Sequence, residues 1–335
     1  MKLLTKKILN DLLIGSTFYG TGGGGDPLLA KKIYQSLPKD QPIKLKSIKK
    51  FKAEDLFITT YTIGGLSQIP IKRTIINKAQ LIYQQYLCKN ISGIIPVEIG
   101  PLSLALAINL ASKLNLPLVD ADFVGRRSTP EVFLETITLF NISRTPILVI
   151  NNQGNYQILK KSKSYLEEEE FLRKFAEESG GFALVLGYPI TQLQAQKSLV
   201  SRSVSNAITA GIKIKNKKLV GKKLFQGKIS RIKLVNQGSF TVKEVKIKNA
   251  NNTANLYIKN ENLLLWINGK ITLTCPDLII LLDQKNKPIF NLNLKLNQKI
   301  NVIGVKAPTL WRSQKGQKLF NPKLFGFNFK PKLLS

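Results

Sequence analysis

Three carboxylates are the residues of this sequence best placed to do chemistry. Asp120 and Asp122 lie two positions apart in a predicted strand, and Glu98 ends the predicted strand before it. Side chains two apart on a strand share a face, and open α/β sheets present ligands at the carboxyl ends of their strands, so we expect one shared crevice. We predict that Asp122 is the catalytic base, that Glu98 raises its pKa, and that Asp120 orients its surroundings. The alternative is a strand end held by ordinary salt bridges.

Residues 20–27, which read GTGGGGDP, form a second candidate site. Glycines leave backbone N–H groups uncovered, and an Asp-Pro pair can cap and open a helix. We therefore predict an anion or carbonyl site here, with a plain flexible turn as the alternative. The predicted substrate-binding residues of this loop are Gly22, Gly23, Gly24, Gly25 and Asp26. The run matches the G-x-G-x-x-G dinucleotide fingerprint, but a predicted helix precedes it where the fingerprint needs a strand, so NAD is not expected.

The sequence contains no histidine. This excludes Ser-His-Asp and Cys-His nucleophile systems and every His-ligated metal site. A divalent metal, if one is bound, must take oxygen ligands from Glu98, Asp120 and Asp122, and Cys275 is a further candidate ligand. Cys88 and Cys275 are far apart in the sequence and fit reduced thiols packed in a core, which indicates a cytoplasmic protein.

Further charged residues follow the predicted strand that carries the two aspartates. Arg126 lies in the turn after it, where it can pair with the carboxylates or bind a substrate. Glu131 completes a Ser-Thr-Pro-Glu sequence that fits a helix capping box, and Glu135 lies one turn later on a face that is more often solvated than catalytic.

The elements that must position these residues alternate between strands and helices in the first half of the chain. Short apolar runs separate helical patterns, which is typical of α/β layering. Strands are predicted at 56–63, 93–97, 117–123, 146–150 and 182–190, and helices at 3–19, 27–37, 70–88, 102–114, 130–140, 165–179 and 198–210.

From about residue 222 the pattern changes to strands separated by turns. The predicted strands are 240–247, 256–258, 263–267, 278–282 and 300–305. We therefore predict an α/β N-terminal domain over residues 1–165 and a C-terminal domain over residues 166–335 that is helical at first and then predominantly β. Asn260 and Glu261 form a polar tip in this part, which is either a turn or a substrate-binding pair that leans over the crevice of the first domain.

The 335-residue chain carries a formal net charge of +31, which raises nucleic-acid binding as a function. The lysines are scattered along the whole chain and form no strong patch, so compositional bias is the favoured cause and a nucleic-acid partner is not expected. No run approaches the ~18 apolar residues of a membrane span, and residues 1–15 read as an amphipathic helix rather than a targeting segment. We expect a small-molecule substrate and no membrane span, and leave a homo-oligomer open.

Eight stretches, in order along nearly the whole chain, resemble one protein family. They are GTGGGGDP at 20–27, VEIG at 97–100, LPLVDADFVGR at 116–126, QGN at 153–155, LFQGKI at 224–229, NENL at 260–263, PDLI at 276–279 and LFGF at 324–327. In this order and spacing the chain resembles the two-domain S-methyl thiohydantoin desulfurases, which are associated with hydantoinase genes.

The resemblance implies a hydrolytic desulfurase, in which water attacks the amidine-like carbon of an S-methylated thiohydantoin, methanethiol leaves and a hydantoin forms. Such a reaction needs a base, an acid and a small polar crevice, which the carboxylates and the Gly-rich loop can supply without histidine. The alternative class is a non-catalytic family member or a basic protein that binds nucleic acid or another anionic partner. A continuous lysine face and binding that falls steeply with salt would indicate that alternative.

Overall fold

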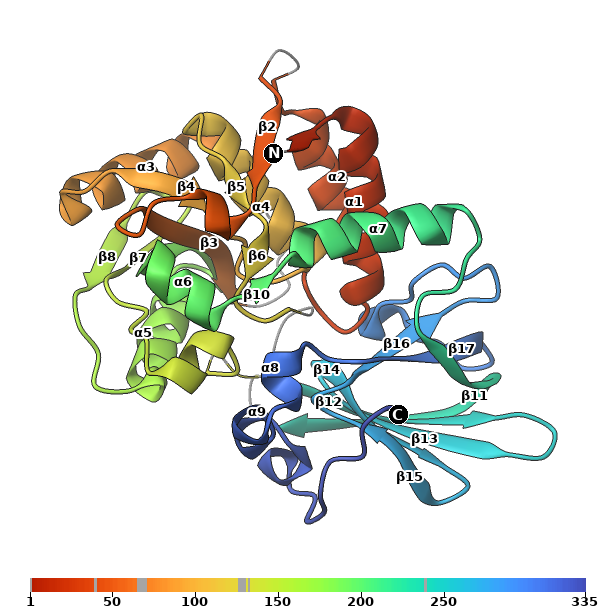
Figure 1. The fold of residues 1–335 in the computed structure, drawn as a ribbon. Helices are drawn as coiled ribbons and strands as arrows, with labels where there is room; N and C mark the ends of the chain where they lie inside the picture. The colour runs from red at the N-terminus through yellow and green to blue at the C-terminus, as the bar shows by residue number, and fades with distance from the viewer. Residues whose placement is uncertain (1, 39–40, 65–70, 126–130, 132, 238–239) are drawn as a thin grey trace.

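The computed structural model describes residues 2–335 apart from 39–40, 65–70, 126–130, 132 and 238–239. The chain forms two bodies that lie against each other, an α/β body on an eight-stranded sheet and a curled antiparallel sheet of seven strands (Figure 1). The fold class predicted from the sequence, an α/β domain followed by a predominantly β domain, is therefore confirmed.

The first sheet has the strand order β1-β2-β5-β4-β3-β9-β7-β8. Its strands are β1 (Lys2–Leu4), β2 (Ile43–Lys46), β3 (Leu56–Gly64), β4 (Ile91–Ile94), β5 (Leu118–Val119), β7 (Ile147–Ile150), β8 (Tyr156–Leu159) and β9 (Phe182–Thr191). The pairings β2-β5, β5-β4 and β4-β3 are parallel, and the others are antiparallel. Because parallel strands end at the same edge, the side chains that follow β4 and β5 come together there.

Helices cover both faces of this sheet. One face carries α1 (Lys6–Tyr19), α2 (Pro27–Gln35), α3 (Arg73–Leu87), α4 (Pro101–Lys113) and α7 (Ser203–Lys215), and the other carries α5 (Tyr165–Glu178) and α6 (Gln192–Ser198). Alternation along β7 shows how one strand serves both cores, since Leu148 and Ile150 face the first layer and Ile147 and Val149 the second.

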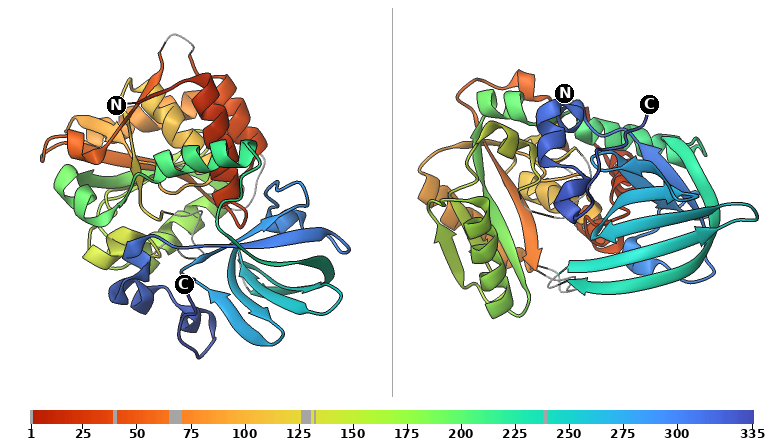
Figure 2. Two further views of the ribbon diagram at one scale, coloured as in Figure 1. Left: turned by 45° about the vertical axis from the view of Figure 1, so that its right-hand side comes forward. Right: turned by 90° about the horizontal axis from the view of Figure 1, so that it is seen from below.

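The second sheet has the order β15-β14-β13-β12-β11-β17-β16. Its strands are β11 (Lys222–Gln237), β12 (Phe240–Lys248), β13 (Thr253–Lys259), β14 (Glu261–Ile267), β15 (Lys270–Thr274), β16 (Leu278–Leu282) and β17 (Lys299–Val305). Register shifts between Lys223 and Phe225 and between Ile229 and Arg231 bend the long strand β11. Figure 2 shows the sheet curling into a half-barrel.

The C-terminal segment returns from the second sheet to the α/β body. After β17 come the short helices α8 (Thr309–Arg312), α9 (Gln314–Leu319) and η4 (Pro322–Phe325), and Figure 1 shows α8 and α9 below the α/β body. The indole N–H of Trp311 donates to the carbonyl of Val124 at 2.7 Å. A shared core that includes Phe18, Leu134 and Leu278 joins the two bodies. None of the helices in the described part of the chain has the length and apolar character needed to cross a bilayer.

The helix predicted at 130–140 is wrong. The described residues of this stretch form a loop and a short 3-10 helix, η2 (Thr136–Phe140). The reason is a tertiary contact, because the Thr136 N–H and Oγ1 both donate to the Phe123 carbonyl, at 2.7 and 2.9 Å, and so tie the chain to a strand end.

Two further predictions needed correction next to this loop. The strand predicted at 117–123 is interrupted at Asp120, after which β6 (Ala121–Asp122) pairs with β10 (Val200–Ser201) instead of continuing in the large sheet. The helix predicted at 198–210 starts only at Ser203, because the residues before it form β10. The break gives Asp120 and Asp122 different neighbours.

Candidate active site

Asp122 ends β6 and is fully buried under the turn that follows. The N–H groups of Gly125 and Val124 donate to its Oδ2 at 2.6 and 3.2 Å, and no hydrogen bond from a described residue reaches its Oδ1. Burial raises the pKa of Asp122 to about 8, against the lowering effect of Gly125 and the Ser203 hydroxyl, and the charge of Glu98 adds to the rise. At neutral pH the carboxyl is therefore mostly protonated, and because Oδ2 accepts two N–H bonds the proton belongs on Oδ1.

Glu98 lies after β4, just before the start of α4, and is 8% exposed. The Ser103 hydroxyl donates to its Oε1 at 2.7 Å. Burial raises the pKa of Glu98 to about 7, Ser103 lowers it, and the charge of Glu135 raises it. Glu98 and Asp122 are close enough to influence each other's titration, so their protons must be treated as those of a coupled pair.

The Gly-rich loop packs against the start of α4, next to Glu98. Gly24 and Gly25 have φ of +80° and +81°, and a Cβ on Gly24 would lie 2.6 Å from the Gly100 Cα, so only glycine fits. The Leu102 N–H donates to the Gly24 carbonyl at 2.9 Å. A Cβ on Gly100 would lie 2.4 Å from the Gly24 Cα and 2.9 Å from Glu98 Oε1, so Gly100 lies between the loop and this carboxylate.

The remaining residues of the loop have simpler roles. Asp26 is exposed, and its Oδ1 accepts the Leu28 N–H at 2.8 Å, so it caps α2 as the Asp-Pro pair predicts. Gly22 and Gly23 are half-buried. The helix α1 leads directly into the loop, where a dinucleotide fingerprint would need a strand.

Asp120 is occupied as a cap of α7. Its Oδ1 accepts the Ser205 N–H at 2.9 Å, its Oδ2 accepts the Ser205 hydroxyl at 2.6 Å, and its carbonyl accepts the Arg202 N–H at 2.7 Å. Both oxygens thus hold the helix that lies beside Asp122. This contact is structural, and the orienting role expected for Asp120 in catalysis stays a prediction.

The three carboxylates do not assemble into the metal site that the sequence analysis considered. Asp120 is turned into α7, and within the described part of the chain no three Asp, Glu or Cys side chains are grouped so that they could hold a metal ion. Cys275 is buried in the core shared by the two bodies, while Cys88 is exposed at the end of α3 and does not occupy the core expected for it.

The other charged residues singled out in the sequence lie in different parts of the structure. Arg126 lies outside the described residues, so its place beside the carboxylates stays a prediction. Glu131 pairs with Lys259, whose Nζ donates to its Oε1 at 2.7 Å, while the other residues of its predicted capping box also lie outside the described residues. Glu135 was expected on a solvated helix face and is instead buried directly before η2, where Thr136 ties the chain to Phe123.

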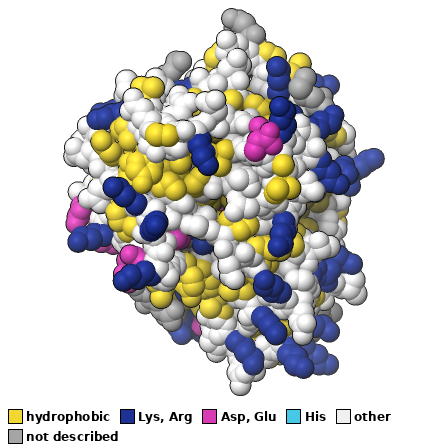
Figure 3. Space-filling model, turned by 60° about the vertical axis from the view of Figure 1, so that its left-hand side comes forward, with side chains coloured by type: hydrophobic (Ala, Val, Ile, Leu, Met, Phe, Trp, Pro, Cys, Tyr) yellow, Lys and Arg dark blue, Asp and Glu magenta, His cyan; other side chains and the backbone are white. Residues whose placement is uncertain are grey.

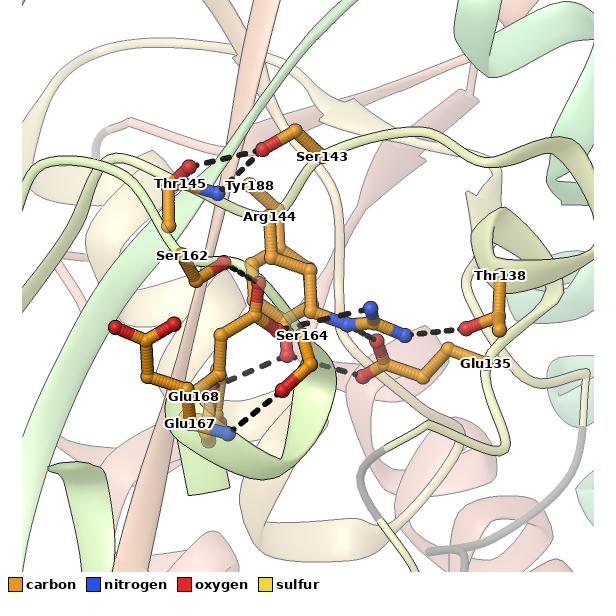
Figure 4. Close-up of polar contacts among 11 residues, drawn as sticks. Glu135, Thr138, Ser143, Arg144, Thr145, Ser162, Ser164, Glu167, Glu168 and Tyr188 are labelled. Atoms are coloured by element: carbon orange, nitrogen blue, oxygen red, sulfur yellow. Dashed lines mark hydrogen bonds and ion pairs between the residues drawn. The ribbon is translucent and has the colours of Figure 1, made fainter. Parts of the chain in front are cut away.

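Glu135 belongs to a buried polar network close to the carboxylate pair (Figure 4). The Arg144 Nε donates to its Oε2 at 2.8 Å, and the Tyr188 hydroxyl donates to its Oε1 at 3.2 Å. Arg144 also pairs with Glu168 at 3.7 Å, and Tyr188 shares a hydrogen bond of 3.2 Å with Tyr61. Burial raises the pKa of Glu135 to about 6, although Arg144 lowers it. Sequence reasoning missed this network because its members come from separate elements and share no motif.

Asn260 and Glu261 lie at the junction of the two bodies. The Asn291 Nδ2 donates to the Asn260 carbonyl at 3.1 Å, and the Asn291 N–H donates to the Thr21 carbonyl at 3.0 Å. Asn260 has the φ of +54° that is typical of a tight turn, and Glu261 is fully buried at the start of β14. The predicted polar tip is therefore a turn, and Asn291 connects it to Thr21 at the start of the Gly-rich loop.

A cavity of about 450 Å³ is lined by residues of both bodies, and its described lining includes sequence neighbours of Glu98 and Asp122 but neither carboxyl itself. Ile99, Gly125 and Ser203 line one wall, and residues 306–310 of the second body line the other. Ile99 directly follows Glu98, and Gly125 holds Asp122, so each carboxyl lies just behind this wall. The Gly-rich loop is not part of the lining formed by the described residues, and it supports the wall through the start of α4. The volume suits a small ring compound.

The fold and this site define a two-body protein with a pair of buried carboxyls beside an interdomain cavity. Family comparison is more specific, because the S-Me-THD-like N-terminal domain matches residues 7–161 and the S-Me-THD-like C-terminal domain matches residues 163–333. The chain therefore belongs to the S-methyl thiohydantoin desulfurase-like family, as its motifs indicated. The strand β9 and helix α7 fall in the C-terminal match, yet β9 lies in the first sheet between β3 and β7.

Among solved structures, a protein from Chromobacterium violaceum is similar over the whole fold. It has a TM-score of 0.80 and 20% sequence identity, over 100% of this chain and 99% of that one. At this identity the likeness shows the fold alone. The comparison with curated proteins gives no match.

Proposed function

We propose that this protein is a hydrolase that acts on a small thiohydantoin- or hydantoin-like ring in the cavity beside Asp122 and Glu98. The observation that carries the proposal is the pair of buried carboxyls with pKa values of about 8 and about 7. Carboxyls whose pKa values are shifted toward neutrality can exchange protons with a substrate at physiological pH. Membership of the family supports a hydantoin-related role.

The two carboxyls divide the acid and base roles by their pKa values. Asp122 was expected to be the base, but it is fully buried while Glu98 is slightly exposed, so burial disfavours the charged form of Asp122 more strongly and we propose the reverse assignment. Glu98, with the lower pKa, is ionised first and accepts a proton from water, while Asp122 retains its proton for donation. One oxygen of Glu98 is held by Ser103, which orients the other for proton transfer.

The reaction that fits this pair is hydrolysis of an S-methyl thiohydantoin. Glu98 takes a proton from water as the water oxygen bonds to the ring carbon, and Asp122 protonates the ring nitrogen. When the carbon–sulfur bond breaks, the bonding electron pair goes to sulfur. Glu98 then donates the proton that it took from water to the sulfur, and the new hydroxyl group on the ring carbon gives its proton to Asp122. Methanethiol and a hydantoin form, and both carboxyls regain their starting states.

Replacement of Asp122 tests the proposal. Asp122→Asn keeps the shape of the side chain but removes the acidic proton, so kcat for release of methanethiol from an S-methyl thiohydantoin should fall by about 10²-fold or more. The matched control is Asp283→Asn, because Asp283 also accepts two backbone N–H groups, those of Lys285 and Lys287 at 2.8 Å each, in a turn of the second body. The control should keep full turnover. Full turnover by Asp122→Asn would refute its catalytic role.

A second candidate function, binding of an anionic partner, is favoured by a separate hollow. A hollow of about 770 Å³ is lined by Lys223, Lys228, Lys248 and Lys299, with no acidic residue in its described lining. Lys299 begins β17, so this hollow lies at the opposite end of that strand from the cavity beside Asp122. On the face shown in Figure 3, Lys and Arg side chains form separate small groups and not one continuous patch.

A further inference from the structure

The N-terminus of α7 faces the cavity with an unsatisfied hydroxyl group. Ser203 is the first residue of α7, lines the cavity and is only 5% exposed. Its Oγ is buried and makes no hydrogen bond to any described residue. Buried polar atoms in folded proteins nearly always have a partner, so this hydroxyl requires an explanation.

The same helix end has donors to offer a ligand. The first N–H groups of a helix have no acceptor within the helix, and the capping residue Arg202 provides no side-chain bond. Asp120 satisfies the N–H of Ser205, which holds the helix end in place. The helix dipole adds positive potential here, Lys306 on the opposite wall adds a positive charge, and no carboxylate belongs to the described lining. The subsite therefore suits an oxygen acceptor and not a cation.

Asp122 supplies a second polar group that a ligand could bind, in addition to the Ser203 hydroxyl at the end of α7. Its Oδ1 is buried and, like the Ser203 Oγ, has no hydrogen-bond partner of normal geometry among the described residues, while the two side chains lie close enough for a hydrogen bond from Ser203 to lower the pKa of Asp122. A cyclic amide presents a carbonyl oxygen and a ring nitrogen side by side. It can therefore satisfy the hydroxyl donor and the carboxyl group at once, whereas an apolar ligand would leave both unpaired.

We infer that Ser203 and the N-terminus of α7 bind the carbonyl oxygen at C4 of the ring, the one that does not react. This inference rests on the proposed function, because it takes the ring carbon attacked by water to be C2. It makes Ser203 a substrate-binding residue that fixes which face of the ring meets the carboxyl pair.

Titration calorimetry with two rings tests the inference. Hydantoin has both carbonyl groups, whereas 2-imidazolidinone lacks the one at C4. Ser203→Ala should raise the Kd for hydantoin about tenfold, the loss expected for one hydrogen bond, and should leave the Kd for 2-imidazolidinone unchanged. The control is Thr209→Val, which removes an exposed hydroxyl from the same helix that bonds only to the Ser205 carbonyl at 2.9 Å. It should bind both rings like the unmodified protein.

The outcomes separate the inference from the proposed function. If hydantoin binds the unmodified protein and Ser203→Ala equally well, the Ser203 hydroxyl instead rotates and forms a hydrogen bond with Asp122. The inference then fails while the proposed function stands. If Ser203→Ala weakens both rings by the same factor, the hydroxyl does not recognise the C4 carbonyl and the inference also fails. If hydantoin does not bind the unmodified protein at all, both proposals fail.

Discussion

At the scale of single residues, the turn after β6 decides the chemistry of Asp122. Two backbone N–H groups hold Oδ2, and burial keeps the carboxyl away from water, so the charged form is disfavoured and the acidic proton remains on Oδ1, which accepts no backbone N–H group. Glu98 has only the Ser103 hydroxyl as a hydrogen-bond donor among the described residues, and it is slightly exposed. Small differences in hydrogen bonding thus give different pKa values to two carboxyls that the sequence presents as equivalent.

The raised pKa of Asp122 predicts a specific dependence of stability on pH. Its folded pKa of about 8 lies above the ordinary value of 3.8. The contribution of Asp122 to the stability of the folded protein is therefore fully present below about pH 4 and is lost as the pH rises through 8. Asp122→Asn cannot ionise and removes this loss. The free energy of unfolding of the variant, relative to the unmodified protein, should therefore rise by several kcal/mol between pH 4 and pH 9.

Urea unfolding at both pH values, compared with the pH-matched difference for Asp283→Asn, measures this effect. A difference between Asp122→Asn and the unmodified protein that does not change with pH would mean that Asp122 titrates normally in the folded state.

At the scale of elements, the pair of helices α1 and α7 positions both sides of the site. The two helices cross in Figure 1, and α1 leads into the Gly-rich loop while α7 begins at Ser203. Their contact depends on glycine, because a Cβ on Gly15 would lie 1.8 Å from the Ala207 carbonyl oxygen and one on Gly211 would lie 1.7 Å from the Asp11 carbonyl oxygen. No side chain fits at such distances without moving a helix.

Gly211→Ala should consequently destabilise the protein and displace α7. We expect a loss of roughly 3 kcal/mol in the free energy of unfolding, at the upper end of the usual cost of overpacking a core, even though alanine is the better helix former. Thermal or urea unfolding measures the loss. Thr209→Ala, on the exposed side of the same helix, is the control and should change stability by less than about 0.5 kcal/mol. A Gly211→Ala protein as stable as the control would show that the helices are not in close contact.

At the scale of the whole molecule, the cavity takes one wall from each of the two bodies. The second sheet supplies one wall, and that wall is held by Asp277, whose Oδ1 accepts the Ala307 N–H at 2.8 Å. Trp311 then ties α8 to the carbonyl of Val124, next to the turn that holds Asp122. The two bodies therefore form one site, although each has a core of its own.

The basic hollow in the second body gives a prediction at the same scale. If it binds an anionic partner, Lys223→Gln with Lys228→Gln should weaken binding of a fluorescent single-stranded oligonucleotide at least tenfold, with a shallower dependence on salt. Fluorescence anisotropy at several salt concentrations measures this. Lys31→Gln with Lys32→Gln in the exposed part of α2 removes the same charge and is the control. Equal loss in both double variants would show only non-specific attraction by the +31 charge, and the second candidate function would fail.

The sequence by itself determined most of the elements and the family. Local signals are strong where periodicity, capping and turn residues agree, as in α2, where an Asp-Pro pair caps the helix. The glycines of the loop at 20–25 also carried their meaning locally, because the positive φ values of Gly24 and Gly25 exclude side chains. The caps and turns depend on neighbours within a few residues, which the sequence displays directly, whereas the contacts of Gly24 and Gly25 with residues 100–102 come from the tertiary fold.

Only the tertiary structure decided how the polar residues divide their roles. Asp120 and Asp122 are two positions apart, but Asp120 caps a helix 85 residues away in the chain while Asp122 is held by its own turn. Glu135 is buried because Thr136 bonds to Phe123, and no local pattern predicts such a contact. Burial and hydrogen bonding set the pKa of a carboxyl, and both arise from segments distant in the chain. The sequence could therefore propose the acidic residues, but only the packed fold could assign them to catalysis, capping or support.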